Sequence, residues 1–508
     1  MKKVKYHILD LQQTKDHFSR EIGSLSPFEI GIPLVDISDK TIEEIYYFRW
    51  HTYCKHIKNT PAGYVVTEFL PDVPWAGKYN TINCPAGHHF YEGRWFHDQK
   101  YIDSYARFWF TEDASPRLYS FWAADSILAV SKVTGDFTVA EELYEKLKEN
   151  YAAWEKEKKL ENGLFYQIDD RDGMEYSAGG SGCRPTINSY MYGDAIAISK
   201  IAARLSKVGE AAERTGERAK KAEKYAEEAA EYAEKARLIK EKTDALLWDE
   251  DACFYKTLSM KGEPGKVPVR ELIGYIPWYF NLPDRDKASA WKFLNDEAYF
   301  DAPYGPTTTE RNCPDFMKEF DHECLWNGPS WPFATAQTLT ALANLLCNYE
   351  QDVMNKSDYY RQLKRYANCH YLTENGRTVP FIDENLDPFT GEWIARKLLH
   401  EMENPPGGAD RGADYNHSSF CDLVLSGLAG IRAREDDVLE VNPLFAPEDL
   451  EYFCADGILY HGHEICVLWD RTGERYHKGK GFYVYCDGNE TYRADVPGKA
   501  EIDIKKGK

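Results

Sequence analysis

The sequence predicts a mainly α fold: an (α/α)6 toroid followed by a small antiparallel β region. Helical patterns succeed one another from about residue 41 to residue 430 with no alternating strands, which argues against a doubly wound sheet. Two helix exits, at 161–167 and 249–256, share an acidic turn followed by an apolar-aromatic pair, as repeated helical hairpins would. After residue 430 the pattern changes to short apolar or alternating stretches broken by Gly and Asp.

Eleven helices are expected, close to the twelve that six hairpins need. The first begins at Thr41, with Glu44 three residues later as in a capping box, and the third closes at Gly135. In the run 210–247 the recurring residue is alanine, which is too small for a coiled-coil core, so we expect one long outer helix with a solvated charged face. The expected ranges are 41–57, 98–110, 118–135, 139–159, 186–205, 210–247, 269–280, 288–297, 330–349, 357–372 and 418–431.

Five segments after residue 430 are expected to form the β region: 437–445, 451–462, 463–473, 480–490 and 491–499. His461 and His463 alternate in this region, so we expect them on one strand face. Three parts are therefore predicted. They are an N-terminal extension (1–40) that packs on the barrel, a helical domain (41–430) that carries the candidate site, and a β-sheet region (431–508).

Charge and composition exclude several classes of partner. There are 62 basic and 83 acidic side chains, a net charge of −21, so nucleic acid and anionic membranes are poor partners. No apolar stretch reaches the length of about 18 residues that a membrane span needs. The first twenty residues also lack the apolar core of a secretory signal, so we expect a cytoplasmic location. The twelve cysteines form no CxxC pair, which argues against zinc ribbons and a disulfide framework.

The abundance of aromatic residues points to carbohydrate. Trp, Tyr and Phe make up 14% of the chain, and their ring faces stack on the C–H surfaces of sugars while carboxylates accept from hydroxyls. Nucleotide-binding glycine motifs and HExxH are absent, and residues 179–183 (GGSGC) only approach the serine-hydrolase motif. We therefore expect a small carbohydrate or glycoside substrate, no cofactor and no metal.

Four loops at expected helix ends combine carboxylates, aromatic residues and glycines: 169–185, 326–332, 383–393 and 410–417. Glycoside hydrolysis needs two carboxyl groups across the scissile bond. One is protonated to assist the leaving oxygen, and the other attacks or activates water. We take Glu175 and Glu384 as these two groups, which a helical ring would bring face to face. Asp410 and Asp414 remain alternative bases.

Residues expected to bind the sugar supply stacking surfaces or hydrogen bonds to hydroxyls. They come from the same four loops, from the loop 72–80 and from neighbouring helix starts. The set is Trp75, Asn80, Trp122, Asp172, Arg184, Asn188, Trp326, Asn327, Trp331, Trp393, Arg411, Tyr415, Asn416 and His417.

The segment 326–332 (WNGPSWP) resembles the W-R-G-P-x-W-P signature of the (α/α)6 glycosidases of glycoside hydrolase family 63. It is also close to mannosylglycerate hydrolases and trehalase-like proteins. Residues 384–391 are similar to the family's E-x-x-x-P-x-T-G segment, whose glutamate is the general base. Residues 173–177 lie where the family has G-x-D-N-S-P, whose aspartate is the general acid. Over about residues 40–430, the resemblance implies an inverting, exo-acting glycosidase that uses no metal.

The chain departs from the family pattern near the sugar. Glu175 stands where the family has Asp, and Tyr176 where it has Asn. The family's early Trp–Asp pair is stretched to Trp122 and Asp125, which adds Asp125 to the expected sugar contacts. These differences leave the sugar and its anomer open.

Two other functions remain possible on this toroid. A sugar phosphorylase would need a basic cluster such as Arg184 with Arg411, and an epimerase typically carries paired histidines. A non-catalytic carbohydrate-binding protein would use the carboxylates only to hold hydroxyls. The sequence does not determine the oligomeric state.

Overall fold

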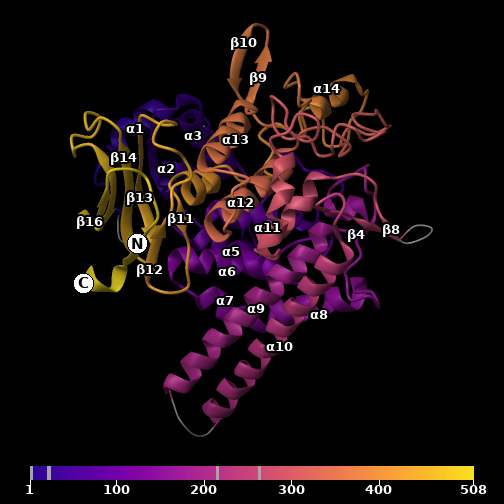
Figure 1. Ribbon diagram of the computed structural model, residues 1–508, viewed down its shortest axis with the longest axis horizontal. Helices are drawn as coiled ribbons and strands as arrows, with labels where there is room; N and C mark the ends of the chain where they lie inside the picture. Colours follow the sequence, from indigo (N-terminus) through magenta and orange to yellow (C-terminus); the bar gives the residue numbers. More distant parts are fainter. Residues whose placement is uncertain (1–3, 20–24, 213–216, 261–264, 508) are drawn as a thin grey trace.

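The computed structural model describes residues 4–19, 25–212, 217–260 and 265–507. The chain is mainly helical, with a C-terminal antiparallel sheet at one side (Figure 1). Within the described residues no helix is long and apolar enough to cross a membrane. The α-helices are α1 (Leu11–Phe18), α2 (Pro27–Ile30), α3 (Lys40–Lys55), α4 (Ala86–Gly93), α5 (Lys100–Phe108), α6 (Ala123–Thr134), α7 (Thr138–Glu142), α8 (Tyr144–Lys158), α9 (Pro185–Ala212), α10 (Glu217–Leu246), α11 (Ile276–Tyr279), α12 (Pro332–Asn348), α13 (Lys356–Asn368) and α14 (Ile394–Glu401).

Short helical turns and strands complete the described elements. The 3-10 turns are η1 (Lys78–Asn80), η2 (Asp169–Asp172), η3 (Leu272–Tyr275), η4 (Arg285–Phe293) and η6 (Ile504–Gly507), and η5 (Leu423–Leu428) is a π-helical turn. The strands are β1 (Leu34–Ile37), β2 (Ile57–Thr60), β3 (Gly63–Val66), β4 (Gly182–Cys183), β5 (Trp248–Asp249), β6 (Phe254–Tyr255), β7 (Leu258–Ser259), β8 (Gly265–Lys266), β9 (Tyr371–Glu374), β10 (Arg377–Pro380), β11 (Ile431–Arg432), β12 (Val438–Val441), β13 (Tyr452–Tyr460), β14 (His463–Asp470), β15 (Gly481–Cys486), β16 (Asn489–Ala494) and β17 (Ala500–Asp503).

The helices close into a ring, as predicted. Helix α4 packs on α6, α6 on α9, α9 on α11, α11 on α12, α12 on α13 and α13 on α3. The ring closes where the Tyr53 hydroxyl of α3 donates to the backbone carbonyl of His89 in α4, at 2.7 Å. Loops at the ends of these helices therefore converge on one mouth, which is where a toroid places its site.

Helix α3 begins one residue earlier than predicted, and its cap differs. The side chain of Asp39 accepts from the backbone N–H groups of Thr41 and Ile42, so Asp39 is the cap and the predicted capping box at Thr41 is wrong. The close of α6 is confirmed, because Gly135 takes a left-handed φ of 72° directly after Thr134.

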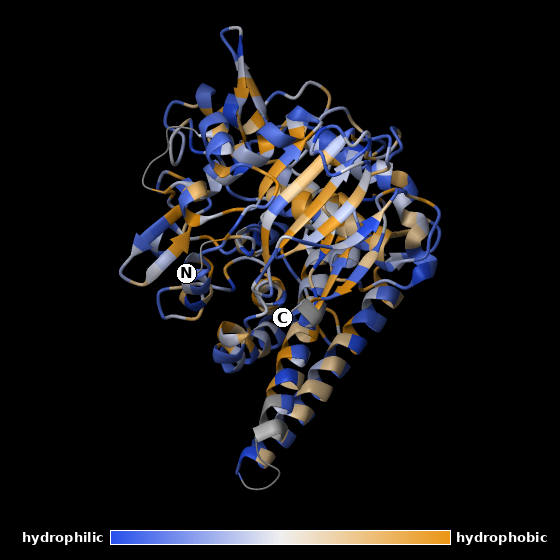
Figure 2. Cartoon of the chain, turned by 90° about the vertical axis from the view of Figure 1, so that its left-hand side faces the viewer, coloured by the Kyte–Doolittle hydropathy of each residue, from blue (hydrophilic) through white to orange (hydrophobic). Residues whose placement is uncertain are grey.

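Several other boundaries also differ from prediction. The expected helix 139–159 divides into α7 and α8, while 269–280 and 288–297 form only short helical pieces or 3-10 turns. The short helices α4 and α14 were not predicted. Residues 210–212 belong to α9, residues 213–216 lie outside the described part, and the charged helix α10 begins at Glu217. Helices α9 and α10 lie side by side and extend away from the ring, with hydrophilic and hydrophobic residues mixed along them (Figures 1 and 2).

The C-terminal sheet has the strand order β1-β13-β14-β15-β16, and all its described pairings are antiparallel. Strand β1 from the N-terminal extension pairs with β13 in the register Leu34 to Asp456. The carboxylate of Asp456 also accepts from the backbone N–H groups of His7, Ile8 and Leu9 at 2.6–2.9 Å. Because α1 and α2 contact α3, the extension joins the sheet to the ring.

The two histidines of the β region do not share a strand face, contrary to prediction. His461 lies in the turn between β13 and β14 with a φ of 49°, and its ring lies 2.9 Å from the backbone carbonyl of Lys132. His463 begins β14, where its ring lies 2.8 Å from the Asp487 carboxylate. The turn interrupts the alternation on which the prediction relied.

Candidate active site

A cavity of about 160 Å³ lies at the mouth of the ring and contains both predicted catalytic glutamates. Glu175 and Glu384 reach it from loops far apart in the sequence, and aromatic side chains form much of its wall. Its lining is Glu68, Phe69, Trp75, Ile82, Cys84, Tyr119, Gly173, Glu175, His322, Glu323, Cys324, Trp326, Trp331, Phe333, Glu384, Arg411, Tyr415 and His417.

The loop 326–332 holds the two glutamate loops together through the main chain. The backbone N–H of Trp326 donates to the carbonyl of Glu175 at 3.0 Å. Ser330 and Leu386 exchange both of their backbone hydrogen bonds, at 2.9 and 3.0 Å, which fixes the strand end just after Glu384. Gly328 takes a φ of 151°, and a Cβ there would lie 2.9 Å from Met317, so this close packing requires glycine. The two glutamates therefore meet because one rigid loop bonds to both segments.

A buried ion pair holds the loop that carries Glu175. The Nε of Arg184 donates to Asp172 at 2.5 Å, and the Ser120 hydroxyl donates to the other oxygen of the same carboxylate. The guanidinium of Arg184 also donates to the Ser177 hydroxyl at 3.0 Å, on the far side of Glu175 in the sequence. Arg184 and Asp172 are both almost fully buried. They thus clamp the loop on both sides of the glutamate.

Glu175 has the character of a protonated acid. Burial among cavity-lining groups raises the pKa of its carboxyl group to about 8. A hydrogen bond from its own backbone N–H lowers the pKa, and the charges of Asp170 and Glu384 raise it further. A carboxyl with such a pKa holds its proton at neutral pH. It is therefore able to donate a proton to a leaving oxygen.

Glu384 is bonded through both of its carboxylate oxygens. The Nε of Arg411 donates to Oε1 at 3.0 Å, and the Cys324 thiol donates to Oε2 at 2.5 Å. The guanidinium of Arg411 lies 4.9 Å from the ring centre of Trp75, which holds it against the cavity wall. Arg411 thus places a positive charge directly beside the Glu384 carboxyl group.

A third glutamate, Glu68, was missed by the sequence analysis. It follows β3, lies in the same cavity and is 6% exposed. The Tyr415 hydroxyl donates to its Oε1. Burial raises the pKa of Glu68 to about 8, and the charges of Glu384 and Glu175 raise it further against that hydrogen bond. The sequence offered a signal for Glu68, because the loop 72–80, which was expected to contact the sugar, begins only four residues after it.

Eight of the predicted site residues line the cavity. Trp326 and Trp331 stack face to face, with ring centres 4.5 Å apart and planes 14° apart. The eight are Trp75, Glu175, Trp326, Trp331, Glu384, Arg411, Tyr415 and His417.

Nine predicted residues, all in the described part of the chain, lie outside the cavity lining and support the structure instead. Asn80 bonds to the backbone of Val73, Phe69 and Pro71, and Asn188 to that of Phe165 and Arg184. Trp122 is packed in the core, Asp125 accepts a hydrogen bond from Tyr91, and Asp172 pairs with Arg184. The other three donate to backbone carbonyls: Asn327 to those of Asp315 and Lys318, Trp393 to that of Tyr371, and Asn416 to that of Thr67.

The two alternative bases lie apart from the cavity lining. Asp410 is exposed and pairs with Arg396 at 2.5 Å. Asp414 takes a φ of 61° and pairs with Lys55 at 2.6 Å. The basic cluster of Arg184 with Arg411 that a phosphorylase would need does not line this cavity, because Arg184 is bonded within its own loop and Arg411 is the one arginine among the described lining residues.

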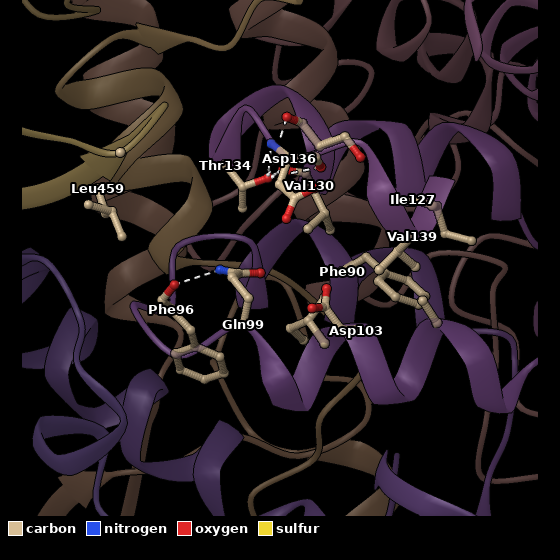
Figure 3. Close-up of a pocket in the computed structure, with 14 residues that line it drawn as sticks. Phe90, Phe96, Gln99, Asp103, Ile127, Val130, Thr134, Asp136, Val139 and Leu459 are labelled. Carbon is tan, nitrogen blue, oxygen red and sulfur yellow. Dashed lines mark hydrogen bonds between the residues drawn. The ribbon is translucent and has the colours of Figure 1, made fainter. Parts of the chain in front are cut away.

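A second cavity of about 160 Å³ lies where α4, α5 and α6 meet the turn between β13 and β14 (Figure 3). Its wall is mostly apolar, with Phe90, Ile127 and Leu459, and burial raises the pKa of Asp103 at its edge to about 6. None of the described residues lining it was predicted for the site. Since it lacks a facing pair of glutamates, we place the candidate site in the first cavity.

Comparison with known proteins agrees with this geometry. Residues 78–418 match the mannosylglycerate hydrolase MGH1-like glycoside hydrolase domain, and residues 431–491 match the C-terminal domain of glycosyl hydrolase family 65. A structure described as a sialidase is 38% identical with a TM-score of 0.86 over 98% of this chain, and the chain spans only 45% of that protein's length.

The GH63 mannosylglycerate hydrolase of Thermus thermophilus in complex with glucose shares the fold. The two structures align with a TM-score of 0.51 at 14% sequence identity, and the aligned region covers 77% of this chain and 99% of the Thermus chain. The predicted (α/α)6 toroid with its C-terminal β region is thereby confirmed. The chain therefore belongs to the MGH1-like glycoside hydrolase family.

Proposed function

We propose that the protein is an inverting, exo-acting glycoside hydrolase that cleaves a terminal glycosidic bond of a small glycoside or oligosaccharide. Glu175 is the general acid and Glu384 the general base. The observation that carries this proposal is that two carboxyl groups from distant loops share one small cavity and have different surroundings there. Burial raises the pKa of Glu175, whereas Glu384 is bonded to the guanidinium of Arg411.

In this mechanism the sugar packs against the aromatic side chains that line the cavity, Trp326 and Trp331 among them. Glu175 gives its proton to the leaving oxygen as the glycosidic bond breaks. Glu384 takes a proton from a water that attacks the anomeric carbon from the opposite face. Arg411 keeps Glu384 oriented through its hydrogen bond to Oε1. The hydrolysed sugar leaves with inverted configuration.

The size of the cavity supports action at chain ends. A cavity of about 150 Å³ is large enough for one six-membered carbon ring, and this one measures about 160 Å³. The cavity is therefore of a size suited to a single ring, and the rest of a longer substrate extends from its open side.

The charge of the cavity supports a neutral sugar in that position. Arg411 is the only Lys or Arg among the described lining residues, and each of its three nitrogens is already bonded within the protein. They donate to Glu384, to Glu323 and to the carbonyl of Pro406. A sugar carboxylate would thus be buried beside glutamates without a free cation, which is strongly unfavourable.

A panel of aryl glycosides of neutral sugars tests the proposal, with NMR of the first anomer released. We expect at least one sugar to be hydrolysed with inversion. Glu175→Gln and Glu384→Gln should each lower kcat at least about 100-fold, and Glu403→Gln, a change on the exposed surface, should leave it unchanged. Substrates with activated leaving groups should suffer least in Glu175→Gln, because they need less help from the acid. Retention of configuration would refute the assigned roles.

A further inference from the structure

Three consecutive side chains at the cavity form a group of metal-ligating type. His322, Glu323 and Cys324 each offer one ligand atom, and these atoms lie within 4.8 Å of one another. All three line the candidate active site. Tetrahedral zinc places its N, O and S ligands roughly 3.5 Å apart, so side-chain rotation of about 1 Å would bring them to bonding positions.

The surroundings favour a cation at this point. Cys324 contacts Glu384, whose Oε2 accepts from the thiol at 2.5 Å, so a fourth ligand oxygen lies next to the group. Glu68 and Glu175 also line the cavity. Glu323 and Glu384 both bond to Arg411, so two carboxylates share one positive charge, and the remaining negative charge attracts a divalent cation.

The donor set points to zinc rather than to magnesium or calcium. Imidazole and thiolate ligands suit zinc and related thiophilic ions, whereas magnesium and calcium prefer oxygen. The backbone N–H of Cys324 donates to Nδ1 of His322 at 2.9 Å, so Nδ1 carries the lone pair of the ring, and a cation bound there replaces this hydrogen bond.

We propose that His322, Glu323 and Cys324 bind zinc or a similar thiophilic divalent cation, and that this cation inhibits the enzyme by capturing Glu384. The ion bonds to the Cys324 sulfur, and the thiol proton passes to the solvent. No oxidation or reduction takes place. Glu384 then loses the hydrogen bond from the Cys324 thiol, and its carboxylate bonds to the cation instead. A carboxylate bound in this way no longer activates water. The binding site stands on geometry alone, while the inhibition rests on the proposed hydrolysis.

Binding should release about one proton, because the Cys324 thiol that donates to Glu384 must lose its hydrogen when its sulfur bonds to zinc. Calorimetry of zinc binding in buffers of different ionisation enthalpy measures this proton. Cobalt(II) gives an independent readout, since a thiolate ligand produces a charge-transfer band in the near ultraviolet.

The full-length protein is titrated with zinc, magnesium and calcium, and hydrolysis of its best aryl glycoside is followed. We expect zinc to inhibit in competition with the sugar, chelation to restore the rate, and magnesium and calcium to have no effect. Cys324→Ser should raise the zinc concentration for half inhibition at least about tenfold, each rate being compared with that of the same variant without zinc. His322→Ala provides a second test that keeps the thiol.

A matched control is available in the C-terminal sheet. His463, Cys486 and Asp487 form the other such group among the described residues, away from the candidate site. Cys486→Ser should therefore leave the inhibition by zinc unchanged. Equal zinc sensitivity in wild type, Cys324→Ser and His322→Ala would overturn the proposal, as would a cobalt spectrum without the thiolate band. If no glycoside is hydrolysed, calorimetry and the cobalt band still decide the metal site separately from the proposed function.

Discussion

Replacing Glu68 by glutamine should stabilise the fold, and more so at alkaline pH. Glu68 is buried, and its pKa rises from the usual 4.5 to about 8. Below 4.5 the carboxyl is protonated in both the folded and the unfolded chain. Between 4.5 and 8 the unfolded chain loses this proton while the folded chain keeps it, so the free energy of unfolding falls as pH rises. Glutamine does not titrate and therefore escapes this loss.

The size of the effect follows from the pKa difference. From about pH 5 to about pH 8 the folded chain holds nearly one more proton than the unfolded chain, which amounts to about 3 kcal/mol at 1.36 kcal/mol per pH unit. At about 2.1 cal/mol/K of unfolding entropy per residue, the 508 residues give roughly 1 kcal/mol per degree. The advantage of Glu68→Gln over wild type should therefore grow by about 3 °C across this range.

Scanning calorimetry at both pH values measures this advantage. Glutamine keeps a carbonyl oxygen that the Tyr415 hydroxyl can bond, so the comparison isolates the charge. Glu403→Gln, on the exposed surface, is the control and should show the same difference from wild type at both pH values. If the advantage of Glu68→Gln were equal at both pH values, or larger in acid, our assignment of a buried, proton-holding carboxyl would be refuted.

Three further predictions concern the groups around the catalytic pair. The value of kcat/KM should fall about tenfold per pH unit above about pH 8, because Glu175 loses the proton that it donates. A pH profile of kcat/KM that stays flat to about pH 10 would contradict this prediction. Arg411→Met should lower kcat about 100-fold, because it leaves Glu384 without its cation, and Arg411→Lys should restore part of the loss. Steady-state kinetics compare the two variants. Equal rates in Arg411→Met and Arg411→Lys would argue against a role for the positive charge. Asp172→Asn should lower the free energy of unfolding by about 3 kcal/mol, because it leaves the buried Arg184 without its ion pair. Urea denaturation measures the change. A loss below about 1 kcal/mol would show that the pair does not stabilise the loop that carries Glu175.

The long helices were predictable because their patterns are locally determined. The repeated apolar positions and helix-ending glycine of α6 and the Pro at the start of α12 are signals of single helices, and both helices formed where expected. Helix α4 was not predictable in this way. Its eight residues include two histidines and end at Gly93, and it is stable only because it packs between other helices of the ring.

Within the site, residue type was easier to predict than residue role. Glu175, Glu384 and Arg411 were identified because carboxylates and an arginine stood out in glycine-rich and aromatic loops. The same reasoning assigned Arg184 and Asn188 to the sugar, although both bond to their own protein. Sequence alone does not distinguish a polar side chain that faces a cavity from one that satisfies the backbone behind it, because both need the same chemical groups.

The pairing of β1 with β13 has a consequence for how the protein is made. Leu34 lies opposite Asp456, so 456 − 34 = 422 residues separate the partners. At about 5–20 residues per second, a ribosome needs roughly 20–80 s to synthesise the second partner after the first. Throughout that interval the nascent chain carries a strand whose backbone groups have no sheet to join. Strand β1 is thus made long before it reaches its native contacts, and in this interval chaperones have most to protect.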